Sequence, residues 1–164
     1  MSVATASDIA ARVAAVYRRI HVERMAGVPL LHPGLEVAAV GFRVWGDVWL
    51  GVLVTPWCMN LMLLPRDPSA VLPPPSGSKR VVTFPSGEYE FVAGCEPGVG
   101  AYESCSLFSP MGDFADQEAA LATARAVLQV LFDTAVHQID PDANPALRRT
   151  LTRRELLRGA FLGE

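Results

Sequence analysis

The chain has little of what a disulfide framework, a metal centre or a membrane span requires. It holds only three cysteines, Cys58, Cys95 and Cys105, and no CxxC pair. An odd count without a secretory signal argues against a disulfide framework, and the missing CxxC pair argues against a zinc ribbon or a rubredoxin-type site. The first ten residues lack the order of a signal peptide, and no apolar run is long enough to cross a bilayer. We therefore expect a cytoplasmic protein without membrane insertion.

Charge is scarce as well. Only 19% of the residues are charged, the formal net charge is −3, and 51% of the residues are hydrophobic. This composition excludes disorder as the overall state. It also argues against nucleic acid as the main partner, because phosphate backbones are bound by clustered cations. The 164 residues are a natural size for one domain with a sizeable core.

Two helical patterns enclose a long stretch of strand-like runs. The first helix is expected to start at Ser7 or Asp8 and to end before Gly27, and the second to start at Asp113 or Asp116. Glycine, proline and aspartate separate the runs between them. The expected strands are residues 37–44, 48–55, 58–64, 79–84, 88–93 and 100–108.

This order of elements predicts an α+β fold. A single domain at residues 1–140 is expected to hold one antiparallel β-sheet, with the N-terminal helix and the helix of the C-terminal half packed on one face. Residues 141–164 are expected to form a linker and a short basic tail. Free sheet edges favour self-association, so the sequence leaves a homodimer open.

The cysteines allow an enzymatic interpretation. Either Cys58 or Cys105 could serve a thiol-dependent redox or hydrolytic enzyme if a base lay beside it. Nothing in the sequence pairs a histidine with either thiol, and free cysteine is usually a small buried hydrophobe. A metal site of His32, Cys58 and Cys105 lacks diagnostic spacing. His32 is expected to bond the backbone of its own turn, so we expect no metal and no cofactor.

Three tryptophans lie close together in the sequence. Trp57 follows Pro56, which cannot donate to a strand ladder, so Trp57 is expected to point outward. Aromatic and methionine side chains together predict an adaptable peptide-binding surface, and burial of the same residues in the core is the alternative. The residues of this predicted surface are Trp45, Trp49, Trp57, Met59 and Met62.

The tail carries a second pattern. Residues 152–158, TRRELLR, are similar to the twin-arginine export consensus: serine or threonine, two arginines, any residue, two apolar residues and a basic one. Arg153 and Arg154 supply the pair. The pattern sits at the wrong end of the chain and no long apolar region follows it, so it cannot work as an export signal.

Four motifs, in this order, resemble the HybE/HupJ family of nickel–iron hydrogenase assembly chaperones. They are LLHP with His32, VTPW with Thr55 and Pro56, FPSGEYEF, and SCSLFSPM with Cys105. The resemblance runs from the first helix through the second. Some relatives carry a rubredoxin-like region with CxxC pairs; this chain has none, so no redox role of that region is transferred.

The resemblance implies a non-enzymatic cytoplasmic chaperone. Its partners would be the small or the large subunit of a nickel–iron uptake hydrogenase, or both, and the twin-arginine signal peptide that the small subunit carries until maturation is complete. Asn60, Glu88 and Glu103 are the expected polar contacts to the arginines of the signal. A further hypothesis is that the tail imitates this signal and competes with it for the same surface.

Overall fold

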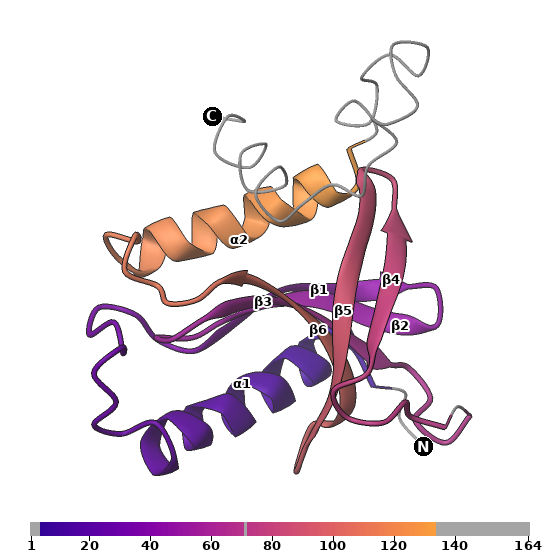
Figure 1. Cartoon of the computed structure of the whole chain (residues 1–164), viewed down its shortest axis with the longest axis horizontal. Coiled ribbons are helices and arrows are strands. Elements are labelled where there is room, and N and C mark those ends of the chain that lie inside the picture. The colour runs from indigo at the N-terminus through magenta and orange to yellow at the C-terminus, as the bar shows by residue number, and fades with distance from the viewer. Residues whose placement is uncertain (1–3, 71, 134–164) are drawn as a thin grey trace.

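The computed structural model describes residues 4–70 and 72–133, which form two helices and six strands (Figure 1). Every predicted element is present, with differences only near the ends. Residues 134–140 of the predicted domain, and the whole predicted tail, lie outside the described residues. In chain order the elements are α1 (Ala6–Glu23), β1 (Ala38–Trp45), β2 (Val48–Val54), β3 (Met59–Pro65), β4 (Lys79–Phe84), β5 (Gly87–Glu96), β6 (Gly100–Phe108) and α2 (Gln117–Leu131).

The strands form one sheet in the order β1-β2-β3-β6-β5-β4, and all neighbours are antiparallel. The predicted α+β fold with an antiparallel sheet is therefore confirmed. Trp45 pairs with Val48, and Phe84 pairs with Gly87, so the β1–β2 and β4–β5 hairpins both have two-residue turns. The two edge strands are β1 and β4. Self-association through these edges stays a prediction.

The two helices lie on opposite faces of the sheet (Figure 1). The prediction that both pack on one face is wrong. The α2-side core takes residues from all six strands, among them Leu50, Leu61 and Phe91. The α1-side core holds the alternate residues of the same central strands, such as Leu53 and Met62. Six of the seven residues of β2 are buried, so both of its faces need a cover.

Helix α1 covers only part of its face. Its N-cap is Thr5 rather than Ser7 or Asp8: the Thr5 hydroxyl accepts the backbone N–H of Asp8 at 3.2 Å, and the Asp8 carboxylate accepts that of Thr5 at 2.9 Å. These bonds hold the pKa of Asp8 below its ordinary value. The helix packs mainly on β1 and β2. On the same face, Asn60 of β3 and Tyr102, Ser104 and Ser106 of β6 stay only half-buried, and the candidate site lies there.

Helix α2 begins at the predicted Asp116, whose carboxylate accepts the Ala119 N–H at 2.8 Å. The side-chain amide of Gln117 fastens the segment that precedes β1. It accepts the Glu36 backbone N–H at 2.9 Å and donates to the Glu36 carbonyl at 3.1 Å. The sheet curls around this helix. Trp45 of edge strand β1 stacks on Phe84 of the other edge strand, β4, with ring centroids 4.3 Å apart.

A β-bulge interrupts the register between β1 and β2. Gly41 and Phe42 together lie opposite Gly51 of β2, and Gly41 takes the left-handed conformation at φ +64°. The bulge turns Phe42 onto the α1 side, where its ring lies directly over Gly51. A Cβ at residue 51 would lie 2.3 Å from that ring. Glycine is therefore required at this position by packing.

We expect Gly51→Ala to lower the free energy of unfolding by about 1–3 kcal/mol, because the added methyl group forces the Phe42 ring to move. Gly112→Ala is the matched control, since a Cβ there meets nothing within 4 Å. Urea denaturation of both variants measures the difference. Equal stabilities of the two variants would contradict the packing described for the bulge.

Within the described residues, no helix combines the length and the apolar character that crossing a bilayer needs.

Candidate functional site

The turn that joins β2 to β3 is organised by one buried hydroxyl group. Thr55 Oγ1 accepts the backbone N–H groups of Trp57 and Cys58 at 3.2 and 2.9 Å, and donates to the Cys58 carbonyl at 3.0 Å. Pro56 occupies the second position of the turn, where its fixed φ is favourable. This explains the VTPW motif physically: threonine closes the turn, proline shapes it, and Trp57 projects from it half-buried.

His32 fastens a second loop to this turn. Its backbone N–H donates to the Pro56 carbonyl at 2.9 Å. Its ring Nε2 lies 2.7 Å from the Phe114 carbonyl and therefore donates, while Nδ1 accepts the Gly34 N–H at 3.0 Å. Both ring nitrogens are thus used inside the chain. The sequence-based prediction that His32 bonds the backbone of its own turn is confirmed.

The last turns of α1 face this hairpin and the strands beyond it. The His21 ring lies 5.8 Å from the Trp57 ring. Tyr17, one turn earlier, hydrogen-bonds the Tyr102 side chain of β6. Burial raises the pKa of Tyr17 far above its ordinary value, and Tyr102 and the nearby Glu96 raise it further. The Tyr17 hydroxyl group therefore stays protonated, and the Tyr17 and Tyr102 rings form one aromatic wall.

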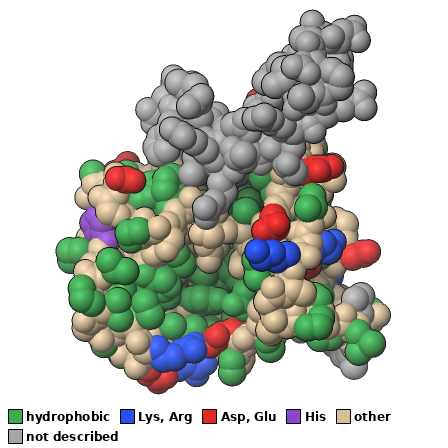
Figure 2. All heavy atoms as spheres, viewed as in Figure 1, with side chains coloured by type: hydrophobic (Ala, Val, Ile, Leu, Met, Phe, Trp, Pro, Cys, Tyr) green, Lys and Arg blue, Asp and Glu red, His purple; other side chains and the backbone are tan. Residues whose placement is uncertain are grey.

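Polar side chains form the floor beside this wall. Asn60 of β3 and Ser106 of β6 are register partners, and Ser104 is the next residue on the same face. Asn60 Oδ1 is buried, and no donor among the described residues reaches it. We call this half-open region the recess, and Figure 2 shows hydrophobic side chains gathered beside α1 on this side of the molecule. The recess is lined by the half-buried side chains of Tyr17, His21, Trp57, Asn60, Tyr102, Ser104 and Ser106.

The structure divides the predicted aromatic and methionine surface. Met59 and Met62 are both fully buried, and they belong to opposite cores. Trp49 is 6% exposed on the α1 side. Trp45 packs on the α2 side against Phe84. Of the five residues, only Trp57 lies in the recess, so the prediction of one exposed surface is wrong. Side chains alternate between the two faces of a strand, so residues an odd number of positions apart enter different cores.

The structure also places the three predicted polar contacts, Asn60, Glu88 and Glu103, at different parts of the sheet. Glu103 lies on the α2 side, where both of its oxygens accept from the Arg80 guanidinium at 2.7 and 2.9 Å. This pairing raises the pKa of Arg80. Glu88 is exposed near the start of β5, two strands away from Asn60 in the sheet order. Asn60 is therefore the one predicted polar contact that the recess contains.

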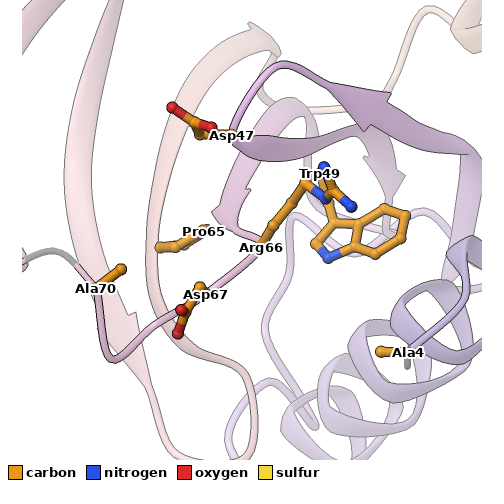
Figure 3. A pocket seen from close by; sticks show the side chains of 7 residues that line it. All are labelled: Ala4, Asp47, Trp49, Pro65, Arg66, Asp67 and Ala70. Carbon is orange, nitrogen blue, oxygen red and sulfur yellow. The ribbon is translucent and has the colours of Figure 1, made fainter. Parts of the chain in front are cut away.

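A separate pocket of about 450 Å³ lies at the other end of β2 and β3 (Figure 3). Its lining residues are Ala4, Asp47, Trp49, Pro65, Arg66, Asp67 and Ala70. The Arg66 guanidinium already lies over the Trp49 ring, 5.8 Å from its centroid. Asp67 accepts two hydrogen bonds from Ser69, which hold its pKa below the ordinary value. These groups have partners, whereas Asn60 Oδ1 does not, so the recess is the stronger candidate.

Three residues of the recess and its rim were missed by the sequence analysis: Tyr17, Tyr102 and Glu96. The helical spacing of Tyr17, His21 and Arg24 could have indicated one face of α1. Nothing in the sequence places Tyr102 opposite that face. The contact depends on the β5–β6 hairpin reaching α1, where the Val16 side chain would lie 2.8 Å from a Cβ built on Gly98.

Comparison with known proteins decides the family. Residues 8–159 match the family model for [NiFe]-hydrogenase assembly, chaperone, HybE. The chain is 41% identical to the hydrogenase expression/formation protein HupT of Azotobacter chroococcum, covering 92% of this chain and 95% of that protein. It is 40% identical to the corresponding HupJ of Bradyrhizobium diazoefficiens, covering 86% and 85%.

The solution structure of HybE from Escherichia coli has the same fold, with a TM-score of 0.62, 27% identity and 87% coverage of both chains. The chain belongs to the HybE family of [NiFe]-hydrogenase assembly chaperones. The resemblance noted in the sequence is thereby confirmed.

The three thiols of this HybE family member differ in their burial. Burial raises the pKa of Cys58, although the hydrogen bond between its thiol and the Thr55 side chain acts in the opposite direction. Cys105 is buried in the α2-side core, and Cys95 is exposed. Among the described residues, no three histidine, cysteine or acidic side chains are grouped as a metal site would need.

We expect iodoacetamide to label Cys95 first and Cys58 slowly at neutral pH, because only the thiolate reacts and burial disfavours the thiolate of Cys58. Mass spectrometry of tryptic peptides over time measures each rate. Labelling of Cys58 that is faster than that of Cys95, and that persists in mild acid, would instead support a thiol enzyme.

Proposed function

We propose that this chain is a non-enzymatic cytoplasmic chaperone that binds immature [NiFe]-hydrogenase subunits and covers the twin-arginine signal of the small subunit until maturation is complete. Membership of the HybE family supports the assembly role. The observation that supports signal binding is the recess, where Asn60 Oδ1 is buried without a donor on the same face of the sheet as half-buried aromatic side chains.

An arginine side chain suits such a site. Guanidinium carries only donors, and its planar face stacks on aromatic rings. Asn60 Oδ1 can accept one of these N–H groups, while Trp57 and Tyr102 offer rings. A buried acceptor without a partner costs free energy, and a ligand that supplies the donor recovers it. The apolar residues that follow the arginine pair of a signal would lie along the hydrophobic surface beside α1.

Release of the client at the right stage requires that the chaperone bind its immature and mature forms with different affinities. The chaperone must bind the immature small subunit more tightly than the mature one, so that completed protein is released for export. A shallow, half-open recess fits a reversible interaction of this kind. It also fits a signal peptide, which is short and reaches the chaperone as an exposed segment of its subunit.

The decisive variant is Asn60→Leu. We expect it to weaken binding of a synthetic peptide carrying the twin-arginine consensus by about 10-fold, because a hydrogen bond to a charged donor is lost. We expect the free energy of unfolding to stay equal or to rise, since the buried acceptor without a donor is removed. Fluorescence anisotropy and urea denaturation measure the two quantities.

Trp57→Ala should also weaken binding, and Trp45→Phe on the opposite face is the matched control that should not. Opposite changes of affinity and stability in Asn60→Leu cannot arise from general damage to the fold. If the peptide binds the wild-type chain and all three variants equally, the recess is not the signal site. If the folded wild-type chain does not bind it, signal covering is wrong.

The tail pattern at Arg153 and Arg154 belongs to this proposal, although it lies outside the described residues. We propose that it competes with the signal for the recess. The tail is joined to the same chain, so its effective concentration would be high. Deleting the residues after Asn144 should then raise affinity for the signal peptide about 10-fold. Unchanged or lower affinity would show that the tail is not a competitor.

A further inference from the structure

One ion pair joins α1 to the strands at the border of the recess. Arg24 is the C-cap residue of α1, and its guanidinium bonds the carboxylate of Glu96, the last residue of β5. Glu96 also lies close enough to Tyr17 to raise that residue's pKa. The other ion pairs among the described residues lie away from the recess: they are Lys79–Glu90 and Arg80–Glu103.

The two residues of this ion pair, Arg24 and Glu96, differ in how far solvent reaches their side chains. The Glu96 side chain is only 17% exposed, whereas the Arg24 side chain is 57% exposed. Glu96 sits on a rigid hairpin: its carbonyl accepts the Val99 N–H at 3.0 Å, and the turn at Gly98 packs against Val16 of α1. The carboxylate is therefore fixed and sheltered, with its position set by the sheet.

Arg24, in contrast, stands where the helix ends. No further regular element begins before β1. Glu96 is the one acceptor found for its guanidinium among the described residues. An exposed ion pair of this kind contributes little to stability, because solvent screens it and a long side chain must be held still. Turning Arg24 out into water is therefore cheap for the fold.

We propose that Glu96 is the receptor carboxylate for one arginine of the client signal, and that Arg24 occupies it only while the client is absent. This inference rests on the proposed function, and it names the charged partner that the recess otherwise lacks. Binding then exchanges one guanidinium for another on the same carboxylate. The charge of the site is unchanged, and the half-buried carboxylate is never left without a partner.

The exchange also predicts selectivity for arginine. A sheltered carboxylate beside the Tyr17 and Tyr102 rings suits a planar guanidinium, which can bond the carboxylate and lie against a ring together. A lysine ammonium also has to break the ion pair between Arg24 and Glu96. It is not planar, so it cannot bond the carboxylate and lie against a ring as a guanidinium does. A twin-lysine peptide should therefore bind this chain more weakly than a twin-arginine peptide.

The test is a double-mutant cycle on the full chain with the same labelled twin-arginine peptide. Arg24→Ala should bind about two- to fivefold more tightly, because the internal occupant is gone. Glu96→Gln should bind about 10-fold more weakly. In the double variant the gain from Arg24→Ala should disappear, since it acts only through Glu96. Arg18→Ala, which removes an exposed charge from the same helix, is the control for net charge and should show no such coupling.

The outcomes separate this inference from the function on which it rests. If the wild-type peptide affinity is retained in Glu96→Gln, or if Arg24→Ala and Arg18→Ala behave alike, the receptor role of Glu96 is overturned while signal binding stands. A folded wild-type chain that does not bind the peptide overturns both. The wild-type chain should bind the twin-lysine peptide more weakly than the twin-arginine peptide. If the Glu96→Gln variant binds the two peptides equally, the assignment is supported, because a merely structural ion pair would not change the preference between them.

Discussion

The structure depends on burying both faces of the β2–β3 hairpin. These two strands are apolar at nearly every position, so one cover cannot remove their surface from water. Helix α2 and the curled sheet enclose one face, and α1 covers the other. Because α1 lies over β1 and β2, the same face of β3 and β6 keeps half-buried side chains. The recess is thus a consequence of how the cores are divided.

The turn between β2 and β3 connects this architecture to function. A single buried hydroxyl, that of Thr55, shapes the turn, and His32 ties a neighbouring loop to it. Trp57 is therefore carried by a rigid element, and Asn60 follows it at the start of β3. The wall opposite comes from α1 and from the β5–β6 hairpin. Four segments that are distant in sequence meet at one place, which suits recognition of an extended peptide.

Local patterns in the sequence predicted the elements well. Glycine and proline turns, strand lengths and the Asp116 cap follow from backbone chemistry that acts over a few residues. The face of the sheet on which each side chain lies was harder to predict. Met59 and Met62 are three residues apart on one strand and so point to opposite cores, and Glu88 and Glu103 face opposite sides. An apolar residue at every position of β2 already indicated two covered faces, but which helix covers which face depends on contacts distant in the chain, as does the meeting of Tyr17 with Tyr102.

The most direct measurement is a nuclear magnetic resonance titration of the full chain with the twin-arginine peptide. The account predicts that the largest shifts fall on the Trp57 indole, the Asn60 side-chain amide and the Tyr102 ring, with little change on the α2 side around Trp45. Shifts concentrated around Trp45 and α2, with the recess unaffected, would contradict the central claim that the recess holds the client signal.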